Sequence, residues 1–235
     1  MNNLTKLVKE VYDMQIKGFP LIKFQSEERI TSLQDGLIYM NSLEWFRKHE
    51  NANGDTVVGD SYEALLHMNE GKIILPDTGE ELEIHNENIK TSVSNDYAYC
   101  MFSINPCVNN FSFTTEQKEN IKSFGDTALL ILDIDEFLSR IRNAALKEGY
   151  EIHFGFVRYY DDTIDSADVI ISLLSGMHNI AFWKRKMYEY QQEYRFLIHT
   201  KDFTKDHLEL NIGDIRDISK VIKASQLLNA KLKKL

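Results

Sequence analysis

Cysteine, proline and long apolar runs are scarce in this sequence, and each scarcity excludes a class of protein. The 235 residues include only 2 Cys and 3 Pro. Two thiols in a chain of this length do not make the disulfide framework of a small secreted domain, and the spacing of Cys100 and Cys107 matches no metal motif. We therefore expect reduced thiols and a cytoplasmic protein. With 43% hydrophobic and 27% charged residues, the composition is that of a folded globular chain.

The apolar runs are too short for a membrane protein. One of the longest, Ala128 to Leu132, falls far below the roughly 20 residues that a spanning helix needs. Near the N-terminus, Lys6, Lys9 and Glu10 interrupt the apolar residues, so that stretch does not have the core of a secretion signal. The sequence predicts neither export nor a membrane partner.

Negative charge is in excess over positive charge. The chain has 36 acidic and 27 basic residues, a formal net charge of −9. Such a surface repels phosphate on average, so we expect no duplex nucleic acid as a partner. It suits a basic partner protein, such as a host protein, through complementary charge.

The pattern of apolar residues predicts a single α+β domain over residues 1–235, with a mixed, mostly antiparallel β core flanked by helices. A polar insertion is expected at about residues 105–124. Strands are predicted at 21–24, 37–41, 97–104, 127–132, 151–160, 193–200 and 208–212, with a hairpin at 72–85. Helices are predicted at 4–16, 26–36, 42–46, 133–145, 165–177, 180–188 and in the Lys-rich tail, and a polar loop at 49–60.

Acidic residues after the strand at 127–132 admit two interpretations. Asp133 and Asp135 could hold Mg²⁺, as in a metal-dependent nuclease. Alternatively, Asp133 caps the following helix and Glu136, three residues later, completes a capping pattern. We favour the cap, and the seven histidines show no metal spacing, so no metal site is predicted. The sequence also lacks the motifs of serine hydrolases, P-loop NTPases and classical dinucleotide-binding folds.

The segment from 182 to 198 is the richest in chemical groups. A strand starting near Gln191 would place a polar set on one face, Gln191, Glu193 and Arg195, opposite an apolar face. Burying these groups is costly unless they serve one another or a ligand. The structural interpretation is an ion pair of Glu193 and Arg195 beside a helical core stripe, with a solvated basic face before it. That stripe would comprise Trp183, Met187, Tyr190 and Tyr194, and that face Lys184, Arg185 and Lys186.

Gln191-Gln192-Glu193 resembles the Gln-x-Glu signature of ADP-ribosyltransferases, which stands at the start of a core strand late in the chain. The resemblance implies NAD as the substrate. It makes Glu193 the catalytic carboxylate, which hydrogen-bonds the nicotinamide ribose and stabilises an oxocarbenium-like transition state. Gln191 would orient the acceptor.

The same resemblance implies residues that hold NAD. The family has a basic residue on its first core strand and a Ser or Tyr on the next, and Lys23, Tyr39 and Ser42 stand in these places. Lys23 replaces the usual Arg or His. Arg195, on the strand of Glu193, completes the predicted contacts to a nucleotide-containing small molecule.

A second resemblance covers most of the chain and implies no activity. The order of four segments resembles a group of bacterial and phage proteins that share a domain of unknown function (DUF2971). This order leaves a second function open, a non-catalytic protein-binding or inhibitor domain in a phage or defence context. The segments are Leu21 to Phe24, Gly36 to Ser42, Gly59 to Glu63, and Lys186-x3-Tyr190-x2-Glu193-Tyr194-Arg195.

Overall fold

The computed structural model describes most of the chain after residue 20. The described residues are 21–53, 57–68, 71–74, 78–84, 87–90, 96–104, 110–162, 168–169, 172, 175–201 and 205–233. The predicted helix at 4–16, much of that at 165–177, and Cys107 lie outside them. Over the described ranges, every helix is too short or too polar to cross a bilayer.

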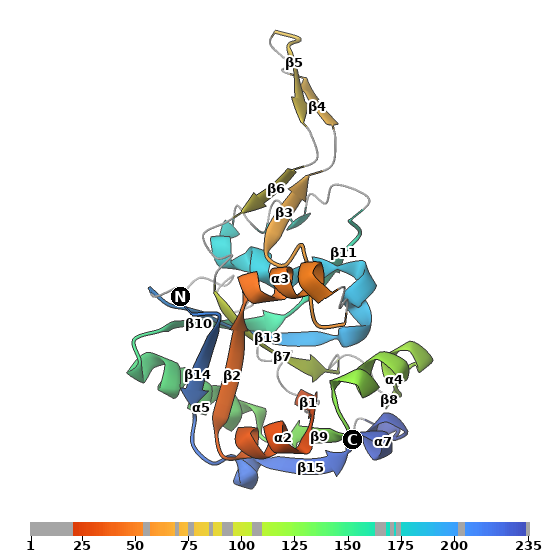
Figure 1. The fold of residues 1–235 in the computed structure, drawn as a ribbon, viewed down its shortest axis with the longest axis vertical. Coiled ribbons are helices and arrows are strands. Elements are labelled where there is room, and N and C mark those ends of the chain that lie inside the picture. Colours follow the sequence, from red (N-terminus) through yellow and green to blue (C-terminus); the bar gives the residue numbers. More distant parts are fainter. Residues whose placement is uncertain are drawn as a thin grey trace, which may run out of the picture.

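An eight-stranded sheet forms the core, and all of its strand pairings are antiparallel. The predicted α+β class, with a mostly antiparallel core flanked by helices, is confirmed (Figure 1). Two strands, β2 (Leu37–Ser42) and β14 (His207–Asn211), join this sheet through β7. The other six lie in the order β10 (Glu151–Phe156), β13 (Glu193–His199), β7 (Tyr97–Ser103), β1 (Leu21–Gln25), β9 (Thr127–Ile131) and β15 (Ser219–Lys223).

The strands carry apolar residues toward both faces of the sheet, and helices therefore cover both faces. On one face, α2 (Glu27–Gln34) and α5 (Ile134–Lys147) pack over a large core cluster. On the other face, α4 (Thr115–Ile121) and α7 (Ala224–Leu228) pack at one end. At the opposite end of that face lie α3 (Leu43–Asn53) and the 3-10 helix η3 (Met177–Phe182).

The sheet divides beside β7, and this division shapes the site. Strand β1 pairs with the end of β7, Ile22 lying opposite Phe102, whereas β2 pairs with its beginning, Asn41 lying opposite Ala98. Between these pairings, the described structure places no strand beside residues 99–101 on this flank of β7. We call this division the fork.

The predicted helix cap at Asp133 is confirmed, and Ser42 forms a second cap. The Asp133 carboxylate accepts a hydrogen bond from the Glu136 amide at 3.0 Å, at the start of α5. The Ser42 hydroxyl accepts one from the Trp45 amide at 3.1 Å, at the start of α3. Each cap satisfies an amide that has no partner within its helix. Capping therefore accounts for Asp133 in the described structure.

The prediction of a helix at 180–188 is wrong. This stretch ends η3, continues as strand β12 (Trp183–Arg185) and enters η4 (Lys186–Gln191). Strand β12 forms because it pairs in parallel with β11 (Arg158–Tyr160), a long-range contact that overrides the local helical spacing. The predicted helical core stripe is accordingly absent, and Met187 is 52% exposed.

Three further predictions need correction. The Lys184 and Arg185 side chains are buried, so they form no solvated face. The loop predicted at 49–60 begins later, because α3 continues to Asn53 and the rings of Trp45 and His49 stack within it. The tail is only partly helical, because β15 adds to the edge of the sheet beside β9.

The remaining elements are short. The predicted hairpin is confirmed by β4 (Gly71–Ile74) and β5 (Glu81–Ile84), which extend with β3 (Leu65–Met68) and β6 (Glu87–Lys90) away from the sheet (Figure 1). The predicted polar insertion adds buried residues, Phe113 and Ile121, to the core. The insertion includes β8 (Asn110–Phe111) and η2 (Lys122–Phe124), and β8 pairs with β16 (Leu232–Lys233) near the C-terminus. The 3-10 helix η5 (Arg216–Ile218) directly precedes β15.

Gly36 is required where α2 turns into β2. Its φ is +94°, and a Cβ there would lie 2.2 Å from the Gly213 carbonyl oxygen. We expect Gly36→Ala to lower the free energy of unfolding by about 1–3 kcal/mol for the backbone conformation, and by more for the clash. The matched control is Gly149→Ala, whose φ is +75° but whose added Cβ would meet nothing within 4 Å. Equal losses in urea denaturation would contradict this account.

Candidate functional site

A cavity of about 680 Å³ opens at the fork. Its walls come from β1, β2, β7 and the chain around η4 and β13. Lys23, Tyr39, Gln191 and Glu193, four residues singled out from the sequence, all line it. Segments far apart in the chain therefore converge on one hollow, whose volume is typical of small-molecule pockets.

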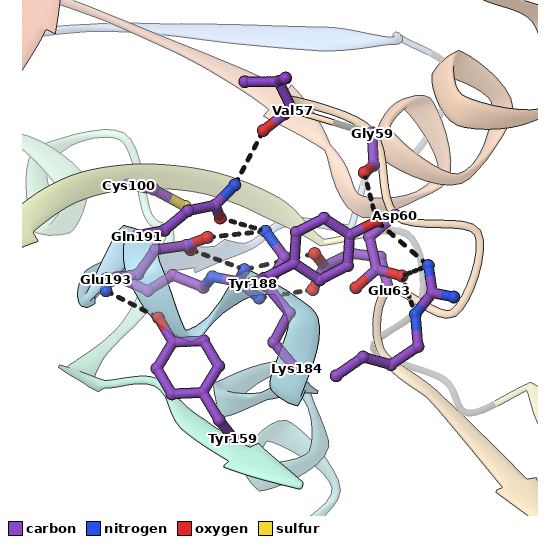
Figure 2. Close-up of polar contacts among 12 residues, drawn as sticks. Val57, Gly59, Asp60, Glu63, Cys100, Tyr159, Lys184, Tyr188, Gln191 and Glu193 are labelled. Carbon is purple, nitrogen blue, oxygen red and sulfur yellow. Dashed lines mark hydrogen bonds and ion pairs between the residues drawn. The ribbon is translucent and has the colours of Figure 1, made fainter. Parts of the chain in front are cut away.

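Glu193 is the first residue of β13 and is only 6% exposed. One carboxylate oxygen accepts a hydrogen bond from the Lys184 amine at 2.7 Å, and the other accepts one from the Arg195 guanidinium at 2.9 Å (Figure 2). The main-chain amide of Glu193 donates to the Tyr159 hydroxyl at 2.9 Å. Main chain and side chain are thus both held, as a preorganised site requires.

The charge state of Glu193 follows from these contacts. Burial alone would raise the pKa of this carboxyl, but the charges of Lys184 and Arg195 hold the pKa well below its usual range. Burial likewise acts to lower the pKa of Lys184, and is outweighed by the carboxylates around it, chiefly Glu193 and Glu63. Both groups are therefore ionised at neutral pH.

Arg195 extends this pairing into the core. The residue is 1% exposed, and its guanidinium donates to the Glu63 carboxylate at 2.5 and 3.3 Å, as well as to the Ala181 carbonyl. We call the sequence Lys184, Glu193, Arg195, Glu63 the buried ion chain. Its two acids and two bases balance, which is what permits charges at this depth. Arg195 is not among the residues that line the cavity.

Gln191 lines the site from a 3-10 helix and not from the strand on which it was predicted. It ends η4, and the next residue, Gln192, turns the chain with φ at +41°, so the strand starts only at Glu193. The Gln191 amide oxygen nevertheless accepts from Lys184 at 2.7 Å, and its nitrogen donates to the Val57 carbonyl at 2.8 Å. Lys184 therefore orients Gln191 and Glu193 together (Figure 2).

The other three predicted NAD contacts differ in position. Lys23 donates to the Cys100 carbonyl at 2.7 Å, on the flank of β7 that faces the fork. Tyr39 is 43% exposed and stacks on the ring of His207. Ser42 is buried, caps α3, and is not among the residues that line the cavity.

A second buried cluster lies beside the first and was not predicted. Arg185 donates to the Asp60 carboxylate at 2.8 Å and to Glu50 at 3.1 Å, and Tyr188 donates to the Gly59 carbonyl at 3.0 Å. Burial, and after it the charge of Glu63, raises the pKa of Asp60 to about 6. The sequence showed Asp60 and Glu63 as polar residues near a loop, but nothing local reveals their partners more than 120 residues away.

Cys100 lies on β7 against the Glu193 carboxylate. Burial, and after it the charge of Glu193, raises the pKa of this thiol to about 12. At neutral pH the group is therefore a neutral thiol, which is a poor nucleophile. Of these two groups, the carboxylate and not the thiol is ionised at neutral pH.

Comparison with known proteins gives no match to a family model, a curated protein or a solved structure. The site must be interpreted from its own residues. It combines a hollow of ligand size, an ionised carboxylate in its wall, and lysines that can face an anionic ligand.

Proposed function

We propose that this protein binds NAD in the fork cavity and transfers its ADP-ribose to an acceptor, with Glu193 as the catalytic carboxylate. The observation that carries the proposal is the convergence of Glu193, Gln191, Lys23 and Tyr39 on one cavity of about 680 Å³. These residues come from three strands and a 3-10 helix, and the tertiary fold brings them together.

The proposed reaction breaks the bond between nicotinamide and ribose. Nicotinamide leaves with the bonding electron pair, the ribose carbon gains positive character, and a nucleophilic atom of the acceptor bonds to that carbon and releases a proton. A fixed negative charge beside the ribose stabilises this transition state more than the ground state. Glu193 supplies that charge, because Lys184 and Arg195 keep it ionised despite its burial.

Lys184 has a further part in the proposal. Its amine contacts both Glu193 and Gln191, so a ribose hydroxyl reaches the carboxylate by sharing or replacing the lysine contact. Lys23 and Lys184 both line the cavity, and their amines can donate hydrogen bonds to a pyrophosphate. Burial lowers the pKa of Lys23, and Lys184 already pairs with Glu193.

The test is release of nicotinamide, or transfer of label from adenylate-labelled NAD, in a lysate that supplies acceptors. We expect wild-type protein to show turnover and Glu193→Gln to lose it by about 100-fold or more, as when a transition-state contact is removed. Because the substitution leaves Lys184 and Arg195 with one carboxylate fewer, circular dichroism and NAD binding must show that the variant is folded.

The matched control is Glu189→Gln, since Glu189 is an exposed acid on η4, close in sequence to Glu193. It should keep wild-type turnover. Absence of turnover by the wild-type protein, or equal turnover by folded Glu193→Gln, would overturn the proposal.

A second candidate function is supported by the pairing of Glu193. Both of its carboxylate oxygens already pair with cationic side chains, as expected of a site that binds a partner without catalysing a reaction. A non-catalytic binding domain, with a net charge of −9 suited to a basic protein, accommodates this arrangement. In the same experiment, stoichiometric capture of a basic protein without any consumption of NAD would favour this candidate.

A further inference from the structure

Three histidines and two carboxylates gather at the far end of the sheet face that carries Glu193. His199 ends β13, six residues beyond Glu193, which places it about 20 Å away along a strand. His178 comes from η3, and His153 from β10. The ring centroids of His178 lie 4.2 Å from those of His153 and 5.4 Å from those of His199. None of these residues lines the fork cavity.

Asp96 is the centre of this histidine cluster. Its side chain is 0% exposed, and its two oxygens lie 3.2 Å from Nδ1 of His178 and 2.7 Å from Nδ1 of His199. Within the described ranges, the ion pairs of Asp96 are with these two histidines alone. A buried carboxylate must be hydrogen-bonded, paired or bound to a metal, and these two imidazoles are the side chains that contact it.

The main chain holds the ligating groups in place. The Asp96 carbonyl accepts a hydrogen bond from the Leu43 amide at 2.7 Å, at the start of α3. His199 lies on a central strand, and stacking against His153 fixes the ring of His178. The cluster therefore rests on rigid elements, as metal sites do.

We infer that Asp96, His178 and His199 form a binding site for Zn²⁺, separate from the fork cavity. One ligand atom from each of the three residues lies within 4.8 Å of the others. Two imidazoles and a carboxylate are a ligand set that Zn²⁺ commonly takes in proteins. A bound cation would place positive charge directly beside the buried Asp96 carboxylate.

The separations between the ligand atoms can be compared with those of a tetrahedral zinc site. With ligand bonds of about 2.0–2.2 Å, the ligand atoms of a tetrahedral zinc site lie about 3.3 Å apart. Nδ1 of His178 lies 3.2 Å from one Asp96 oxygen, close to that value. Nδ1 of His199 lies 2.7 Å from the other oxygen, about 0.6 Å less than the zinc value, so a bound ion would replace this hydrogen bond. The histidine side chains are 26% and 30% exposed, so the ion can enter from solvent and the fourth position is open to water.

The site would join three parts of the chain. Asp96 precedes β7, His199 ends β13 and His178 belongs to η3, so the ion would fasten η3 to the sheet. Such an ion stabilises the folded state in proportion to its binding free energy. The inference does not rest on the NAD proposal, since the two sites share no residue.

The test is titration of chelator-treated full-length protein with Zn²⁺, followed by calorimetry and by metal analysis after dialysis. We expect one Zn²⁺ per chain, and binding weakened in His178→Gln and His199→Gln by at least the roughly 10- to 100-fold that losing a hydrogen-bond partner of a metal ligand costs. Co²⁺ in its place should give the intense visible absorption of a four-coordinate site. If His199→Gln, on strand β13, does not fold, His178→Gln on η3 decides.

The matched control is His207→Gln, which removes a histidine that stacks on Tyr39 and lies outside the cluster. It should bind Zn²⁺ as the wild-type protein does. Failure of the wild-type protein to bind one equivalent overturns the inference. So does binding by folded His178→Gln and His199→Gln that is no weaker than that of the control.

Discussion

Glu63→Gln is expected to lower the free energy of unfolding by about 3–5 kcal/mol, the usual cost of leaving a buried charge without its partner. The side chains of Glu63 and Arg195 are 1% and 2% exposed and join at 2.5 Å. Without the carboxylate, Arg195 is left with Glu193 as its only charged partner among the residues described. Urea denaturation followed by tryptophan fluorescence measures the loss.

A double substitution tests whether charge imbalance is the cause. Glu63→Leu combined with Arg195→Met removes one acid and one base, and leaves Lys184 paired with Glu193. We expect this variant to be more stable than either single substitution, because apolar residues of similar volume often replace a buried ion pair at little cost. Additive losses would contradict the balance described for the buried ion chain.

The control for depth is Glu44→Gln, which breaks an exposed pair with Lys48 in α3. Surface pairs of this kind contribute less than about 1 kcal/mol. The contrast between Glu63 and Glu44 separates the effect of burial from the loss of a carboxylate as such.

Lys184→Met is expected to have the second large effect, again about 3–5 kcal/mol near neutral pH, because it leaves the Glu193 carboxylate buried with one cation fewer. The loss should depend on pH. In the wild-type protein the folded pKa of Glu193 lies below its usual value of 4.5. The carboxylate therefore contributes stability that is present above that value and is lost as the pH falls through the folded pKa.

Without Lys184 that contribution shrinks, so the difference between variant and wild-type protein should be largest at neutral pH and diminish in acid. Denaturant midpoints from pH 3 to pH 8 measure it. Lys186→Met is the matched control, since Lys186 is exposed and only two residues away. A difference that grows in acid, or an equal loss in the control, would refute the role assigned to Lys184.

Much of the fold could be predicted because its elements are signalled locally. The apolar run at 127–131 and the cap at Asp133 specify β9 and α5 without reference to the rest of the chain. The segment from 178 to 191 could not be predicted in this way. Its apolar residues have helical spacing, but pairing of β12 with β11 decides its structure, and that contact is invisible in a local window.

The residues of the site also differ in whether they could be predicted from the sequence. Gln191 and Glu193 could be selected from residue type and position, and Lys23 and Tyr39 from the resemblance to ADP-ribosyltransferases; all four line the cavity. Ser42 and Arg195 were selected as well but do not line it. The burial of Lys184 could not be predicted, since three basic residues in a row normally indicate a solvated surface. The fold brings the carboxylates of Glu193, Glu63 and Asp60 together, and their charges offset the free-energy cost of burying that lysine.

In the proposed NAD site, the fork also affects which atoms contact the ligand. Residues 99–101 of β7 have no described strand along one flank, and Lys23 already donates to one of their carbonyl groups. A molecule in the cavity therefore meets peptide groups as well as side chains. Because peptide groups are the same whatever the residue, recognition at this flank would survive considerable sequence drift, whereas β1 and β2 could not close up without abolishing it.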